Sequence, residues 1–192
     1  MNTRVLLKLA VTVASVMPLA HAEQPVPNMA AAMFETMFLK SMPDHHNVAV
    51  EMSRICLTKG VRTELSTVCQ QVIDAQQREI TMMQNWARTW YEMQVAPQLH
   101  KEDREMLESL RAMTTADFEK EYMKMMIRHH WLAISMAGGC VERAHDLHRD
   151  MEAMCEDIIE TQVDEIRKLR DWLCRRYGNC NFRSDGDLHP KP

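Results

Sequence analysis

An internal repeat limits the possible folds of this chain more than any other feature of its sequence. Residues of the first half recur at an offset of 84 positions, and after two inserted residues the offset becomes 86. Eleven identities in register indicate two similar units that bury their apolar faces against each other. The repeated pairs include Phe34 and Phe118, Met42 and Met126, His45 and His129, His46 and His130, Met52 and Met136, Cys56 and Cys140, Cys69 and Cys155, Gln76 and Gln162, Glu79 and Glu165, Ile80 and Ile166, and Trp86 and Trp172.

The composition of each unit favours helices. Glycine accounts for 5 of 192 residues and aromatic residues for 6%, so turn formers and typical strand formers are scarce. We therefore predict an all-α fold in which two helical hairpins, related by pseudo-twofold symmetry, pack as a four-helix bundle with one longer connection. The expected helices are residues 29–56, 64–93, 107–113, from 114 or 115 to 136, and 146–176, with stops at Gly60, Gly138-Gly139 and Gly178, and with Pro43 either kinking the first helix or starting a new segment near Ser41.

The first 22 residues have the pattern of a secretory signal peptide. Arg4 and Lys8 precede a short apolar run, and Ala20-His21-Ala22 is typical of a cleavage site before Glu23. The run is too short to span a bilayer comfortably, and no later segment resembles a transmembrane helix. We expect a periplasmic or secreted protein without membrane insertion.

The remaining chain is predicted to form one domain over residues 23–180, followed by a flexible tail at 181–192. Its repeat units span residues 34–90 and 118–174, and a connector spans 94–114. Without the signal peptide the chain has 21 basic and 27 acidic residues, a formal net charge of −6. This charge, without a basic block, argues against nucleic acid or an anionic membrane surface as a partner.

The sequence has six cysteines, and four of them occupy equivalent places in the two units. In an exported protein this arrangement predicts disulfides between Cys56 and Cys69 and between Cys140 and Cys155. Cys174 and Cys180 would then close a small loop near the C-terminus. The alternative is a thiolate cluster for a soft metal, although the sequence contains no Cys-x-x-Cys.

Adjacent histidines flanked by methionines are the chemically distinctive part of each unit. Met42 lies one helical turn before His45 and His46, and Met52 follows six residues after the pair. Thioethers beside imidazoles favour Cu(I), with Cu(II) as the alternative oxidation state, whereas methionines at helical spacing also serve as core residues. Neighbouring positions on a helix differ by about 100°, so one histidine of a pair could bind metal while the other bonds Glu79 or Glu165 or lies at the surface. His145 and His148, near the second hairpin turn, are interpreted as surface residues.

These residues resemble the family catalogued as domain of unknown function 305. The shared pattern is Phe, Met and His-His, followed by Gln-x-x-Glu-Ile and Trp, and it covers both units. The resemblance implies a ferritin-like bundle, disulfide-stapled in this chain, and a role in periplasmic copper binding and copper tolerance. Departures are Pro43, one place early, Arg128 in place of proline, and Leu169 at the position equivalent to Met83. The ligands it implies are Met42, His45, His46, Met52, Glu79, Met83, Met126, His129, His130, Met136 and Glu165.

We hypothesise an exported copper-binding protein that sequesters or relays copper, mainly Cu(I), and contributes to copper tolerance or homeostasis. Its partners would be the copper ion and another periplasmic copper carrier or exporter. The sequence lacks a Gly-rich phosphate loop, a Gly-x-Ser-x-Gly elbow and a His-Glu-x-x-His motif, so we do not predict an enzyme. The alternatives are a periplasmic helical chaperone or adaptor without a specific metal site and, less favoured, a metal-dependent oxidase.

Overall fold

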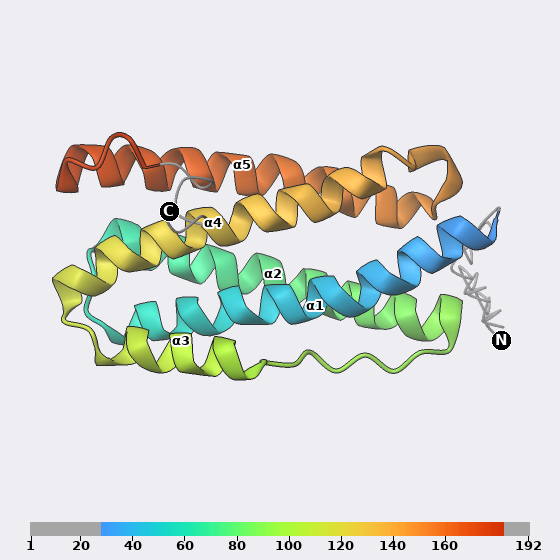
Figure 1. The fold of residues 1–192 in the computed structure, drawn as a ribbon, viewed down its shortest axis with the longest axis horizontal. Coiled ribbons are helices and arrows are strands. Elements are labelled where there is room, and N and C mark those ends of the chain that lie inside the picture. Colours follow the sequence, from blue (N-terminus) through green and yellow to red (C-terminus); the bar gives the residue numbers. More distant parts are fainter. Residues whose placement is uncertain (1–27, 183–192) are drawn as a thin grey trace, which may run out of the picture.

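Five α-helices account for most of residues 28–182, the part of the chain that this computed structural model describes (Figure 1). No strand occurs in this range, so the predicted all-α fold is confirmed. None of the helices in the range has the combined length and apolar character needed to cross a membrane. The predicted signal peptide, residues 1–22, lies outside the described residues. The helices are α1 (Met29–Thr58), α2 (Thr63–Tyr91), α3 (Lys101–Ala112), α4 (Thr115–Val141) and α5 (Arg149–Tyr177), with a short 3-10 helix at Ala144–Asp146.

The four long helices form the two predicted hairpins. α1 packs against α2 and α4 against α5, and the hairpins meet along α1 and α4. Figure 1 shows the turn of the first hairpin at one end of the bundle and the turn of the second at the other. The connection runs back along the first hairpin, where α3 contacts both α1 and α4. Because the hairpins point in opposite directions, equivalent residues of the two units meet near the middle of the bundle.

The first helix continues through Pro43. Its start is capped by Asn28, whose side-chain oxygen accepts a hydrogen bond from the Ala31 amide at 2.8 Å. Pro43 has no N–H to donate to the carbonyl of Leu39, yet both residues are buried and the helix persists. Packing therefore outweighs the local preference of proline, and the predicted alternative of a new segment near Ser41 is wrong.

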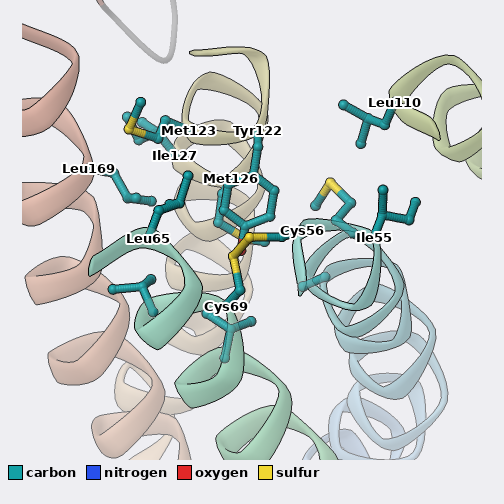
Figure 2. Close-up of a cluster of buried hydrophobic side chains, with 14 of the residues drawn as sticks. Ile55, Cys56, Leu65, Cys69, Leu110, Tyr122, Met123, Met126, Ile127 and Leu169 are labelled. Atoms are coloured by element: carbon teal, nitrogen blue, oxygen red, sulfur yellow. A yellow bond between two sulfur atoms is a disulfide. The ribbon is translucent and has the colours of Figure 1, made fainter. Parts of the chain in front are cut away.

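Two buried clusters fill the bundle, one towards each end. The first core surrounds the Cys56–Cys69 disulfide and joins the end of α1 and the start of α2 to α3, α4 and α5 (Figure 2). The second core surrounds Cys140–Cys155 and joins the start of α1 and the end of α2 to α4 and α5 near their turn. The adjacent histidines of α1 and α4 belong to neither core. They lie between the two cores along each helix.

All three predicted disulfides are present. Their Cα–Cα separations are 6.3 Å for Cys56–Cys69, 6.2 Å for Cys140–Cys155 and 4.1 Å for Cys174–Cys180. The first two close the hairpin turns, and loops of this size contribute roughly 3 kcal/mol each in the chain-entropy model. All six cysteines of the sequence are thereby paired, so the alternative of a thiolate metal cluster is wrong.

The glycine pair at 138–139 does not end α4, contrary to the prediction. The helix runs through both residues to Val141. A Cβ atom on Gly139 would lie 3.1 Å from Cε2 of Phe34, so the missing side chain allows α1 to approach α4 closely. Gly178 does end its helix, with φ at +66° in the left-handed region that glycine adopts without strain.

The two glycines should respond differently to substitution by alanine. A Cβ on Gly138 meets nothing within 4 Å, so Gly138→Ala should raise the free energy of unfolding by about 0.5–1 kcal/mol through helix propensity. Gly139→Ala should lose that gain because its Cβ presses on the Phe34 ring. Urea denaturation of both variants measures the difference, and an equal gain in both would contradict the close approach of Phe34.

The start of the predicted flexible tail is part of the fold. Phe182 is 8% exposed and belongs to the first core, and the Arg128 guanidinium lies 5.0 Å from the centre of its ring. The short Cys174–Cys180 loop turns the chain back towards the bundle. The prediction of a flexible tail is therefore wrong at Phe182, and residues 183–192 lie outside the described residues.

Candidate metal centre

Four histidines meet in the middle of the bundle, where α1 and α4 pack together. The rings of His45 and His129 face each other with centroids 3.6 Å apart and planes inclined by 30°. The ring centroid of His46 lies 6.2 Å from that of His45, and the ring centroid of His130 lies 6.3 Å from that of His129. His46 and His130 are fully buried, whereas His45 and His129 are partly buried. The repeat thus places its two histidine pairs together across the pseudo-twofold axis.

Each fully buried histidine is held by a glutamate from the other helix of its hairpin. His46 Nε2 lies 2.6 Å from Glu79 Oε2, and His130 Nε2 lies 2.6 Å from Glu165 Oε2. The carboxylates were predicted either as direct ligands or as partners of one histidine in each pair, and the structure shows the second arrangement, at Nε2 of His46 and His130. An ionised carboxylate only accepts hydrogen bonds, so Nε2 donates and Nδ1 presents its lone pair. This carboxylate–histidine arrangement orients metal-binding imidazoles in many proteins.

Six ring nitrogens at this point are buried without a hydrogen-bond partner in the described structure. Buried polar atoms are nearly always hydrogen-bonded, so unpartnered ring donors and acceptors side by side require an explanation. Neutral imidazole nitrogens with free lone pairs are metal ligands, and the set fits a metal ion that prefers nitrogen. The six atoms are Nδ1 and Nε2 of His45, Nδ1 and Nε2 of His129, and Nδ1 of His46 and of His130.

The partly buried histidines are neutral at physiological pH. Burial lowers the pKa of His45 to about 3, and the neighbouring His46 and His130 add to this effect. Burial also lowers the pKa of His129 well below its ordinary value, with a further contribution from His45. Metal ligands must be unprotonated, so this environment prepares both rings for a cation.

The predicted methionine ligands divide between the two cores. Met42 and Met83 are buried in the second core, and Met136 packs against it. Met52 and Met126 are buried in the first core. The second core thus combines Met42, which precedes the histidines of the first hairpin, with Met136, which follows those of the second. The first core combines Met126, which precedes the histidines of the second hairpin, with Met52, which follows those of the first.

The length of a helical turn explains this division. Met42 lies three residues before His45, about 4.5 Å along the axis, whereas Met52 lies seven residues after it, at about 10 Å. One ion bound to His45 could not reach both sulfurs. Within residues 28–182, moreover, no three His, Cys, Asp or Glu side chains are grouped as a metal-binding cluster. A complete ligand set here would combine imidazole with thioether.

A second polar cluster at the end of the bundle was not predicted. Glu35 is fully buried and accepts hydrogen bonds from the His148 amide at 2.7 Å and from the Tyr91 hydroxyl at 2.5 Å. Its Oε2 also lies 2.7 Å from His148 Nδ1. His148 is 9% exposed and stacks on Trp90, so its interpretation as a surface residue is wrong.

The repeat contains the signal that would have located this cluster. At the opposite end, Glu119 accepts from the Arg62 amide at 2.8 Å and from the Tyr177 hydroxyl at 2.6 Å. Glu119 corresponds to Glu35, Tyr177 to Tyr91 and Arg62 to His148 at the offsets already noted. The Glu and Tyr pairs are identities in register, so including them in the comparison would have indicated both networks.

The protein is a small helical bundle made of two disulfide-closed hairpins. Histidines lie where the hairpins meet, and methionines lie on either side of them. This arrangement defines a candidate soft-metal centre. The chain belongs to the DUF305 family, because the model of that domain of unknown function matches residues 35–173. No curated protein matches the chain.

Solved structures with the same fold include metal-bound forms. CopM in its Cu(I)-bound form is 28% identical, with a TM-score of 0.66, and the match covers 75% of this chain and 98% of CopM. CopM in its Ag-bound form, obtained by co-crystallization, is 27% identical with a TM-score of 0.65 and the same coverages. A DUF305 protein from Streptomyces coelicolor is 24% identical, with a TM-score of 0.65 and coverages of 75% and 92%, and shows the shared fold alone.

Proposed function

We propose that this protein binds copper, mainly as Cu(I), between the two hairpins and that it sequesters or relays the ion outside the cytoplasm. The observation that carries the proposal is the set of unpartnered imidazole nitrogens, flanked along the helices by buried thioethers. Three disulfides suit the oxidising compartment to which the predicted signal peptide would direct the chain. Similarity to CopM, whose structures include Cu(I)-, Cu(II)- and Ag-bound forms, supports copper as the cargo.

The chemistry of the donors favours the lower oxidation state. Imidazole and thioether ligands are neutral, and the thioether is soft, so the combination suits Cu(I) more than Cu(II) or Zn(II). The nearest carboxylates, Glu79 and Glu165, are already bonded to Nε2 of His46 and His130. A second positive charge would therefore lack a directly coordinating anion. Weak neutral ligands also exchange readily, so transfer to another copper carrier or exporter would proceed by ligand exchange without catalysis.

Removing the central imidazoles should abolish tight copper binding. We expect His45→Gln with His129→Gln to weaken Cu(I) affinity about 100-fold or more, because removing even a residue that only hydrogen-bonds a metal ligand typically costs 10- to 100-fold. Titration of the mature, disulfide-bonded protein against a chromophoric Cu(I) chelator measures the change. His100→Gln is a matched control, since the His100 side chain is 70% exposed and lies on the connector.

The same titration tests the methionines. Met42→Leu with Met126→Leu keeps the buried volume nearly constant and should weaken Cu(I) binding while sparing the fold. If the histidine and methionine variants both retained copper like the parent, the proposed centre would be wrong. Circular dichroism of each variant shows whether the helices are intact.

A second candidate function, that of a helical chaperone or adaptor, is favoured by an exposed stripe on α1. Met29, Met33 and Met37 are 80%, 60% and 68% exposed, and their spacing of four residues places them on one face. Flexible methionines on a surface can adapt to varied apolar clients. Failure of the parent protein to compete with the chelator at all would select this function over copper binding.

A further inference from the structure

A polar groove runs between α2 and α5, on the outer helices of the two hairpins. These two helices are not among the closely packed pairs of the bundle. The groove has a volume of about 400 Å³. It is lined by the repeated Gln-x-x-Glu motif of both units, namely Gln76 and Glu79 from α2 and Gln162 and Glu165 from α5.

The two glutamines lack a partner for their amide oxygens. Gln76 and Gln162 are each 3% exposed, and the Oε1 atom of each is buried without a hydrogen bond in the described structure. An unsatisfied buried amide oxygen is costly, and two at equivalent positions along one groove are not an isolated irregularity. The proposed function assigns them no task, although they belong to the motif that the repeat preserves.

The glutamates of the same motif connect the groove to the histidines. Glu79 and Glu165 are 17% and 16% exposed, and each bonds a fully buried imidazole behind it. The groove is also lined by Asp74, Asp164, Arg78 and Lys168. Together with Glu79 and Glu165 it therefore has four carboxylates and two cations, a formal net charge of −2. A groove with a negative balance attracts cations from solution.

The connector is anchored to α1 next to the first histidine pair. The backbone N–H of Gln98 donates to Oδ1 of Asp44 at 2.7 Å, and Asp44 immediately precedes His45. Gln84 Nε2 donates to the carbonyl of Val95 at 2.9 Å and ties the same segment to α2. An ion approaching there would have to displace ordered backbone, whereas the α2–α5 groove is already open and polar.

We propose that the groove between α2 and α5 is the path by which copper reaches and leaves the histidines, with the amide oxygens of Gln76 and Gln162 as transient ligands. This inference rests on the proposed copper function. Amide oxygen is a hard donor, so it replaces part of the lost hydration of the ion without trapping soft Cu(I). The imidazole and thioether groups beyond it bind more strongly and draw the ion inwards.

A kinetic experiment separates a path from a binding site. Cu(I) is transferred between the mature protein and a chromophoric chelator in a stopped-flow instrument, in both directions. In the double variant Gln76→Leu with Gln162→Leu, loading and release of Cu(I) should both slow about tenfold. This is the effect expected when the ion in the groove loses one contact about as strong as a hydrogen bond and the activation free energy rises accordingly. The equilibrium affinity should stay within about twofold of the parent, since only the barrier changes. Gln77→Leu is the matched control, because Gln77 is exposed on α2 outside the groove.

A steric variant keeps the test independent of the glutamines. Ala75 and Thr161 are equivalent residues that line the groove, and Ala75→Phe with Thr161→Phe should slow both directions by narrowing it. Unchanged rates in both double variants would overturn the path. A loss of affinity with normal loading would also overturn it, since the glutamines would then be resident ligands. If the parent protein itself retained no copper, the proposed function would fail first, which is a separate and recognisable result.

Discussion

Acidification from pH 6.5 towards pH 3 should lower the free energy of unfolding of the copper-free protein by several kcal/mol. The pKa of His45 is lowered by burial to about 3 in the folded chain, against 6.5 for an ordinary histidine. Between these values the unfolded chain binds a proton that the folded chain refuses, so stability is complete above pH 6.5 and falls below it. Each such histidine contributes about 1.4 kcal/mol per pH unit, and His129 acts in the same direction.

The contribution of these two rings can be isolated by substitution. Carboxylates also titrate below pH 5, so the informative quantity is the difference between the parent and His45→Leu with His129→Leu. Urea denaturation at pH 7, 6 and 5 should show a smaller loss in the double variant. At pH 7 the variant should be at least as stable as the parent, because four unpartnered buried nitrogens are gone. Parallel curves for the two proteins would contradict the neutral, buried state of the histidines.

Removing the Glu35 carboxylate should produce the other large effect. Glu35→Ala leaves the His148 amide and the Tyr91 hydroxyl without their acceptor in a buried site that joins α1, α2 and the start of α5. Removing one partner from a buried charged network of this kind typically lowers the free energy of unfolding by about 3–5 kcal/mol. Burial and the adjacent carboxylate also raise the pKa of Tyr91, so its hydroxyl stays protonated and needs an acceptor. Thermal and urea unfolding would measure the loss.

The duplicated chain contains its own control for this prediction. Glu119→Ala removes the equivalent carboxylate, but the Arg62 side chain beside it is 47% exposed and can be solvated by water. We therefore expect a smaller loss than for Glu35→Ala. A change below about 1 kcal/mol in Glu35→Ala would show that water replaces the carboxylate and that the network adds little.

Much of the fold was predictable because the repeat places equivalent residues in equivalent positions. The hairpins and the two hairpin disulfides followed from it, and Cys174 and Cys180 were the pair that remained. The errors came where tertiary packing overrode local preference. Gly139 stays helical because Phe34 packs against its bare backbone, and Pro43 stays inside α1 because that face is buried.

The candidate site was predictable to the level of its motifs but not of its individual contacts. The expected bond between one histidine of each pair and Glu79 or Glu165 is present at His46 and His130. Which ring nitrogen the carboxylate occupies depends on side-chain torsions that spacing does not determine. Met42 and Met52 are ten residues apart, about 15 Å along the helix axis, so they lie in different cores. His148 meets Glu35 across 113 residues, a contact that local sequence cannot indicate.

The facing rings of His45 and His129 have the form expected when one residue meets its own copy across the axis of a homodimer. The molecule resembles two hairpin subunits whose symmetric interface is made permanent by residues 92–114, which join them. Fusion removes the requirement that both ends stay alike. One unit can then have Met83 where the other has Leu169, and Arg62 where the other has His148. A fused pair can thus evolve two unequal half-sites, which a strict homodimer cannot.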